Sequence, residues 1–370
     1  MREDAIEAWK NDPVFSDYYH ETGYVIAASK PENVRHLWET EKPTPERGFV
    51  ELNDAEAFRK TMPEVVLTGD FPDWKGWYNS SGSGWVSAYK ALTAAAREAE
   101  RLGAKLICGS PHGNVVELMR NVDGDVTGAR TADGKEHFAD RTILCAGANA
   151  PQLLDMKDQL RPTAWTLAHI PLSPEESKLY KNLPVLFNIE KGFFIESDGD
   201  ELKICDEHPG YCNWLPDTPK QVSMPFARQQ IPRLSEQGVR TFLQETMPHF
   251  ADRPFSFARI CWCADTPDRH FLISQHPNHP SLTLAVGGSG HGFMQIPVIG
   301  AYIVRCLEGK LDPRMSQTWR WRPETAERRN WQSTQDRYGG SNAVVNLGEI
   351  SDDAWTSVSS NDSRSSAVGF

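Results

Sequence analysis

The chain has 370 residues, of which 39% are hydrophobic and 24% charged, and its formal net charge is -11. A chain of this length buries a sizeable core in two domains or one composite domain, which excludes a miniprotein stapled by disulfides. No apolar run approaches the ~20 residues that a membrane helix requires, so a membrane protein is excluded too. No lysine- and arginine-rich run is present to attract phosphate backbones, which argues against a nucleic-acid partner.

The cysteine count and the N-terminus bear on the compartment. Seven cysteines are an odd number, and the polar opening Met-Arg-Glu-Asp-Ala-Ile does not resemble a secretory signal peptide. Both features favour a reducing intracellular compartment, and we expect the cytoplasm.

The first part of the chain predicts one clear helix among short strands. Residues 88–102 carry apolar side chains at helical spacing and stop at Gly103, which predicts a helix with a glycine end. Asp-Gly pairs at 123–124 and 133–134 predict turns between strands. The predicted strands are 24–28, 105–108, 115–118, 126–129 and 142–147, with a wall segment at 74–78.

The sequence around one of these strands is typical of a cofactor site. Residues 142–144 (Thr-Ile-Leu) have the unbroken apolar character of a parallel strand covered on both faces. Gly147 follows between two alanines and lets the chain turn sharply beside a bulky ligand. We therefore expect a parallel strand that ends at a cofactor.

The rest of the chain alternates between sheet and helix. The region 163–259 predicts an antiparallel sheet with helices, a usual build for a domain that covers a substrate. The tail from Ser351 onward is rich in serine and aspartate and is predicted to be disordered. The predicted elements are strands at 185–189, 192–195, 202–205 and 282–286 and helices at 234–246 and 296–307.

The glycine-rich segment 287–292 (Gly-Gly-Ser-Gly-His-Gly) lies between a predicted strand and a predicted helix. Exposed backbone N–H groups and the positive end of a helix can hold an anionic or polar ring edge there. The alternative is a tight turn that requires glycine only for its dihedral angles.

Cys261 and Cys263 flank Trp262 on a predicted strand, so alternation places both sulfurs on one face. A metal site would recruit further ligands, but the spacing of the pair is not that of a zinc knuckle, and we expect no metal. The further ligands would be Cys205, His208 and Cys212. The remaining alternative is two buried apolar cysteines.

Two sets of charged residues are candidates for holding a substrate. Asp206 and Glu207 follow a strand and precede a Pro-Gly turn, so a carboxylate can point into a cleft and hold a cationic amine or a polyol; the alternative is a solvated turn. Arg320, Arg322 and Arg337 could each grip a carboxylate, although most arginines are surface residues, and spacing does not choose among them.

Long segments resemble the fructosyl amino acid oxidases (amadoriases) and, more distantly, monomeric sarcosine oxidase. The resemblance covers nearly the whole chain to about Asn346. Its most specific runs are residues 9–13 (WKNDP), 69–77 (GDFPDWKGW), 160–165 (LRPTAW), 204–210 (ICDEHPG), 253–266 (RPFSFARICWCADT) and 337–340 (RYGG).

The resemblance implies a flavoenzyme that oxidises a secondary amine with FAD, forms an imine that water hydrolyses, and reoxidises FAD with oxygen to give hydrogen peroxide. By motif match, Cys261 anchors the flavin ring covalently, Glu207 contacts the sugar and the reacting amine, and Arg337 grips the substrate carboxylate. Its partners would be a small-molecule amine and oxygen, and the protein would be a monomer. The residues implied beside the flavin are Val116 near the adenine, Gly147, Ser289, Gly290, His291, Gly292, Phe293 and Met294.

The implied fold is α/β: a Rossmann-like FAD-binding domain without its first βαβ unit, joined to an antiparallel-sheet substrate domain. The expected division is 1–80 mostly substrate domain, 81–160 FAD-binding domain, 161–262 substrate domain, 263–347 FAD-binding domain and 348–370 disordered tail.

Two departures from the family pattern affect what we expect of the chain. The Gly-x-Gly-x-x-Gly turn that cradles the FAD pyrophosphate does not appear before the first residues, so we expect weak or no FAD binding by the isolated chain, as in a truncated, non-catalytic remnant. Met294 stands where the family usually has a lysine, and a thioether carries no positive charge.

Met294 therefore favours slow turnover or a substrate of the saccharopine, pipecolate or sarcosine type, whereas Glu207 favours a fructosyl amino acid. Family members often end in a peroxisomal tripeptide, but this chain ends Ala-Val-Gly-Phe, so the cytoplasm stays the expected location.

Overall fold

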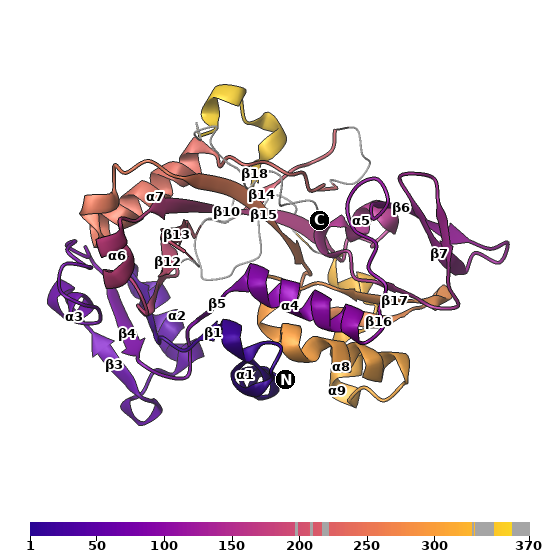
Figure 1. The fold of residues 1–370 in the computed structure, drawn as a ribbon, viewed down its shortest axis with the longest axis horizontal. Coiled ribbons are helices and arrows are strands. Elements are labelled where there is room, and N and C mark those ends of the chain that lie inside the picture. Colours follow the sequence, from indigo (N-terminus) through magenta and orange to yellow (C-terminus); the bar gives the residue numbers. More distant parts are fainter. Residues whose placement is uncertain (197–198, 208–209, 217–221, 328, 330–343, 357–370) are drawn as a thin grey trace.

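The computed structural model mixes helices with several β-sheets (Figure 1). No helix in the parts of the chain that it describes is long and apolar enough to cross a membrane. The structure describes all residues except 197–198, 208–209, 217–221, 328, 330–343 and 357–370. The α-helices within these limits are α1 (Arg2–Asn11), α2 (Pro31–Glu41), α3 (Ala55–Arg59), α4 (Ala88–Arg101), α5 (Ala150–Leu153), α6 (Pro174–Leu179), α7 (Arg233–Thr246), α8 (Ile296–Leu307) and α9 (Pro313–Trp319).

A ten-stranded sheet forms the larger part of the molecule. Its order is β18-β14-β10-β13-β12-β11-β2-β4-β3, with β15 paired to β10. The pairs are antiparallel except β11 with β2 and β14 with β18, so the antiparallel prediction is confirmed for most of it. The strands are β2 (Tyr24–Ala28), β3 (Phe49–Leu52), β4 (Lys75–Asn79), β10 (Arg161–Pro171), β11 (Val185–Asn188), β12 (Gly192–Glu196), β13 (Glu201–Cys205), β14 (Tyr211–Cys212), β15 (Phe257–Asp265) and β18 (Val345–Asn346).

Helix α7 covers one face of this sheet, as Figure 1 shows above β10. Its apolar side chains Val239, Phe242 and Leu243 recur at helical spacing and are fully buried. They share the main hydrophobic core with Leu202 and Ile204 of β13. Burying large side chains of this kind stabilises the fold by roughly 1.5–3 kcal/mol each, so this face is closed to ligands.

Two three-stranded sheets and a two-stranded ribbon complete the fold. The first sheet has the order β16-β17-β9, with β9 parallel to β17, and the second has the order β6-β7-β8. The turn at 123–124 joins β6 to β7, as predicted. The strands are β1 (Tyr19–His20), β5 (Trp85–Val86), β6 (Val115–Arg120), β7 (Val126–Thr131), β8 (Glu136–Phe138), β9 (Thr142–Leu144), β16 (Leu272–His276) and β17 (His279–Val286).

Three expectations from the sequence are wrong. Strand β9 is not covered on both faces, because it lies at the edge of its described sheet and Ile143 is 42% exposed. Residues 105–108 form no strand, since they have no pairing partner among the described residues and Leu106 and Ile107 are exposed. The stretch 348–356 is not disordered: Trp355 is 3% exposed, and Thr356 donates its N–H to the carbonyl of Ile231. The free energy gained by burying that tryptophan offsets the cost of ordering the polar residues around it.

Candidate functional site

The two faces of β10 differ in exposure. Ala164, Ala168 and Ile170 are fully buried on the face toward α7. Trp165 and His169, which alternate with them, are only half-buried on the other face. We call the face with Trp165 and His169 the open face. Residues directly opposite each other in a sheet share a face, so the residues that pair with Trp165, Leu167 and His169 also lie on the open face.

The open face brings together residues that lie far apart in the sequence. On β15, Cys261 is opposite Trp165 and Arg259 is opposite Leu167. From β13, Cys205 packs in the same cluster as Leu167 and Cys261. The predicted alternation of β15 is confirmed, since Trp262 turns away and donates its Nε1–H to the carbonyl of Phe226 at 2.7 Å.

Cys261 is the more accessible sulfur of this cluster. Burial raises the pKa of the Cys205 thiol to about 12, with the nearby Cys261 and Glu207 as smaller contributors that also raise it, so Cys205 is a neutral thiol at physiological pH. Cys261 is half-buried rather than enclosed. A thiol must be reachable and able to ionise to act as a nucleophile, and Cys261 meets the first condition where Cys205 meets neither.

The neighbouring carboxylates Asp206 and Glu207 have different surroundings. Asp206 is 5% exposed and accepts a hydrogen bond from the Thr166 hydroxyl. It lies against α7, where a Cβ on Gly238 would meet its Cβ at 3.3 Å. Glu207, one residue further on, is half-buried and close enough to Cys205 to affect that thiol electrostatically. Glu207 is therefore the carboxylate of this pair that is associated with the open face.

The buried carboxyl of Asp206 predicts a pH-dependent stability. Burial raises its pKa from 3.8 to about 6, so the folded state holds a proton that the unfolded state releases between pH 4 and 6. The free energy of unfolding therefore falls as the pH rises through this window, by about 3 kcal/mol at about 1.4 kcal/mol per pKa unit. We expect Asp206→Asn to remove this fall, measured as the difference between wild-type and variant urea denaturation at pH 4 and pH 7; an unchanged pH profile would contradict the assignment.

The glycine-rich segment forms the predicted turn between β17 and α8. Ser289 and Gly290 have left-handed φ angles of 45° and 80°, and Ser289 is fully buried. The Ser289 N–H donates to the carbonyl of Ala264 at 3.0 Å, and its Oγ accepts the N–H of Thr266 at 3.2 Å. These bonds fix the turn to the end of β15, three residues beyond Cys261.

The rest of the turn packs against the N-terminal helix. Trp9 of α1 stacks on Phe293 with ring centroids 6.2 Å apart and donates its Nε1–H to the carbonyl of Met294 at 2.8 Å. The His291 ring packs edge-on against Phe271. A Cβ at Gly292 would lie 3.0 Å from the Cα of Gly288, so this glycine allows a close approach of backbone. Met294 points its side chain outward, at 57% exposure.

The structure gives two of the three candidate arginines other partners. Arg322 is 2% exposed and pairs with both oxygens of Asp268, at 2.7 and 2.8 Å. Arg320 pairs with Glu324 near the surface. Arg337 lies outside the described residues, as does His208 of the alternative metal set. Arg322 therefore stabilises the fold beside the turn and is not a candidate for binding a substrate.

Gly147 and Val116, which were both predicted to lie beside the flavin, differ in their surroundings. Gly147, with φ of 52°, begins the short helix η3 (Gly147–Asn149), which contacts both β10 and β15. Val116 lies on β6 in the separate small sheet and is 51% exposed. The structure thus brings Gly147, but not Val116, to the strands of the open face. Within the described segments, no three His, Cys, Asp or Glu side chains are arranged to hold a metal ion.

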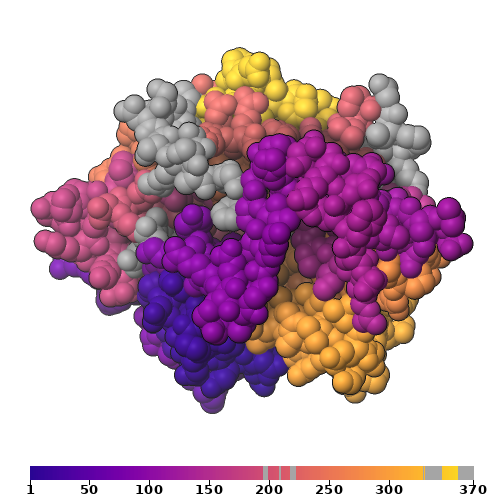
Figure 2. Space-filling view, turned by 45° about the vertical axis from the view of Figure 1, so that its right-hand side comes forward, coloured from indigo at the N-terminus to yellow at the C-terminus, as the bar shows by residue number. Residues whose placement is uncertain are grey.

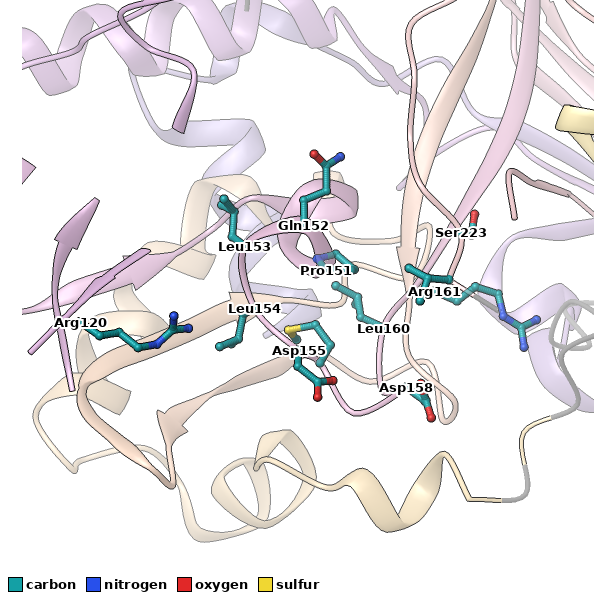
Figure 3. Close-up of a pocket in the computed structure, with 12 residues that line it drawn as sticks. Arg120, Pro151, Gln152, Leu153, Leu154, Asp155, Asp158, Leu160, Arg161 and Ser223 are labelled. Carbon is teal, nitrogen blue, oxygen red and sulfur yellow. The ribbon is translucent and has the colours of Figure 1, made fainter. Parts of the chain in front are cut away.

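The structure has a surface hollow and a cavity in which a ligand could lie. The space-filling view shows the surface hollowed between the purple segment that includes α4 and the orange segment that includes β16 and α8 (Figure 2). A cavity of about 360 Å³ beside α5 and the start of β10 is lined by Arg120, Asp155, Asp158 and Arg161 among others (Figure 3). None of the residues predicted for the site lines this cavity, so it is separate from the candidate site.

The open face and the turn suit a large, partly polar planar group. The face offers an accessible thiol among apolar side chains, and the Oε1 atom of Gln295 is buried just after the turn without a hydrogen-bond partner in the described structure. Sequence reasoning included Trp9 and Arg259 in the runs that carry the family resemblance but gave neither a role in the site. The alternation that placed Cys261 and Cys263 on one face could have placed Arg259 there too, whereas no local pattern could show that Trp9 bonds to Met294, 285 positions away.

Comparison with known proteins agrees with this geometry. A family model described as "FAD dependent oxidoreductase" matches residues 3–306. Amadoriase I from Aspergillus fumigatus, a fructosyl amine:oxygen oxidoreductase, has a solved structure that is 56% identical, with a TM-score of 0.92, over 96% of this chain and 82% of that one. Amadoriase II from the same organism, solved in complex with FSA, is 52% identical, with a TM-score of 0.92 and coverage of 96% and 82%.

A more distant relative is named for a different substrate. L-saccharopine oxidase of Schizosaccharomyces pombe is 26% identical over 346 residues, which are 87% of this chain and 79% of that protein. The family match covers most of the chain, and the structural likeness to amadoriase I covers 96% of it. The chain belongs to the family of FAD-dependent oxidoreductases.

Proposed function

We propose that this protein oxidises the C–N bond of an N-substituted amino acid, with fructosyl amino acids as its first substrate class. The observation that carries the proposal is that Cys261 and Glu207 lie near one another at one open sheet face, while the glycine-rich turn is bonded to the end of the strand that carries Cys261. The names of the solved relatives, a fructosyl amine:oxygen oxidoreductase and a deglycating fructosamine oxidase, support this substrate class.

Each residue has a role that follows from its chemistry. The Cys261 sulfur would hold the flavin covalently, and the backbone of the turn at Ser289 and Gly290 would approach its polar edge. The Glu207 carboxylate would accept hydrogen bonds from substrate hydroxyls and hold the cationic amine. Arg337 would bind the α-carboxylate through two parallel hydrogen bonds.

When bound, FAD supplies the hydride acceptor and passes the two electrons to oxygen, which becomes hydrogen peroxide. The substrate loses a hydride from carbon and a proton from nitrogen, and water then hydrolyses the resulting imine. Glu207 is the described carboxylate that would orient the amine for this loss. The monomeric state and the cytoplasmic location expected from the sequence stay predictions.

A second candidate is an oxidase of the saccharopine, pipecolate or sarcosine type. Met294 supports it, because its exposed thioether brings no cation to the turn. Peroxide release from fructosyl-glycine, N-methylglycine and saccharopine, measured as kcat/KM, distinguishes the candidates. The proposal requires the fructosyl compound to be turned over fastest; no peroxide from any of the three would support a non-catalytic remnant.

Covalent attachment gives a sharper prediction. In protein expressed with added FAD, we expect a proteolytic peptide containing Cys261 to carry the mass of the flavin, and Cys261→Ser to lose it completely because a hydroxyl is a far weaker nucleophile than a thiolate. Cys263→Ser is the matched control, since its sulfur lies on the same face two residues away, and it should keep the modified peptide. A modified peptide in Cys261→Ser would refute the assignment.

A further inference from the structure

Arg259 is a half-buried cation on the open face. It lies two residues before Cys261 on β15, so their Cα atoms are about 7 Å apart at the strand rise of about 3.3 Å per residue. Its Nε atom is buried without a hydrogen-bond partner. Among the residues that the structure describes, no ion pair or hydrogen bond to its guanidinium is found.

Two other buried or partly buried arginines of the described chain show the usual arrangement, an ion pair with a carboxylate. Arg322 binds Asp268, and Arg253 binds both oxygens of Glu176 at 2.8 Å. An unpaired guanidinium in a partly dry place loses hydration without compensation, so it destabilises the protein unless a ligand supplies an anion. A bound anion would supply the partner that Arg259 lacks among the described residues.

The described neighbours of Arg259 that follow supply it with no anion. Leu167, Cys205 and Phe257 form an apolar cluster around its part of the sheet. Glu201 on the same face accepts hydrogen bonds from the Ser256 hydroxyl at 2.8 Å and lies 2.7 Å from His169 Nδ1. Glu201 is therefore directed to Ser256 and His169, and no described ion pair joins it to Arg259.

We propose that Arg259 binds a second carboxylate of the substrate, so that, among fructosyl amino acids, those whose amino acid carries two carboxylates are preferred. This inference rests on the proposed function, in which Arg337 holds the α-carboxylate and Glu207 holds the amine. Arg259 then adds a planar, bidentate partner for a carboxylate on the far side of Cys261 from the turn. A monocarboxylic substrate leaves this guanidinium unpaired.

The test compares two non-oxidisable ligands in flavin-loaded protein. Thiodiacetate and methylthioacetate carry a thioether in place of the amine and differ by one carboxylate. We expect isothermal titration calorimetry to show thiodiacetate binding at least tenfold more tightly to the wild type. Arg259→Gln should bring the two dissociation constants to within about twofold, because a charge-assisted hydrogen bond accounts for roughly a tenfold or larger ratio.

Lys203→Gln is the matched control, because it removes a cation from the neighbouring strand β13, opposite His169 on β10. It should keep the tenfold preference, and the melting temperature of Arg259→Gln should equal or exceed that of the wild type. The proposal is overturned if the wild type binds both ligands equally, if Arg259→Gln keeps the preference, or if Lys203→Gln loses it as well. Peroxide release from monocarboxylic substrates tests the proposed function separately, since it does not depend on Arg259.

Discussion

Arg322→Met is expected to lower the free energy of unfolding by about 1–3 kcal/mol, the usual cost of leaving a buried hydrogen-bond acceptor without its donor. The guanidinium binds Asp268 through two bonds and also donates to the carbonyls of Phe271 and His270, at 3.1 and 3.0 Å. Its loss leaves these acceptors without their donor in the segment that fixes the turn. Urea denaturation at pH 7 measures the effect.

Arg320→Met serves as the control, because Arg320 pairs with Glu324 at the surface two positions away. Exposed pairs of this kind contribute about 0–1 kcal/mol, so this variant should unfold close to the wild type. Equal losses in the two variants, or a loss below about 1 kcal/mol in Arg322→Met, would show that the bonds of the buried Arg322 guanidinium do not hold this part of the fold.

Glu207→Gln is expected to lower kcat/KM for fructosyl amino acids by about a hundredfold or more. The change keeps the shape of the side chain but removes the charge that the cationic amine requires, and hydrogen bonds to charged groups contribute roughly 1.5–3 kcal/mol each. Peroxide release at several substrate concentrations measures kcat/KM. The content of covalent flavin should stay unchanged, since Glu207 is not the attachment residue.

Asp206→Asn is the matched control for this prediction. It neutralises the adjacent carboxyl, but Asp206 is buried against Thr166 and α7 rather than on the open face. Its kcat/KM should stay within about threefold of the wild type. Similar losses in both variants would mean that the general electrostatics of the segment, and not a contact of Glu207, controls the reaction.

Alternation explains how much of the site can be predicted from the sequence. The two-residue period of β15 predicts that Cys261 and Cys263 share one face, and the register with β10 confirms it. The glycine-rich segment predicts both the turn and its position before α8. Strand alternation and glycine turns depend on residues that are neighbours in the sequence, so the sequence can predict them.

Features that depend on distant partners were not predictable. The apolar run of β9 gave no sign that Ile143 would be exposed, because coverage depends on elements elsewhere in the chain. Spacing could not show that Arg322 pairs with Asp268, 54 positions away. The polar composition after Ser351 concealed Trp355, which Arg228 covers with its guanidinium 3.8 Å from the ring centroid.

The most direct test of the account is the visible absorption spectrum of the purified protein, expressed with added FAD, before and after acid precipitation. A covalent bond retains flavin even where reversible binding is weak. The account predicts flavin bands that stay with the precipitated wild-type protein and are absent from precipitated Cys261→Ser. A colourless precipitate from the wild type would contradict the claim that the open face around Cys261 is the flavin site.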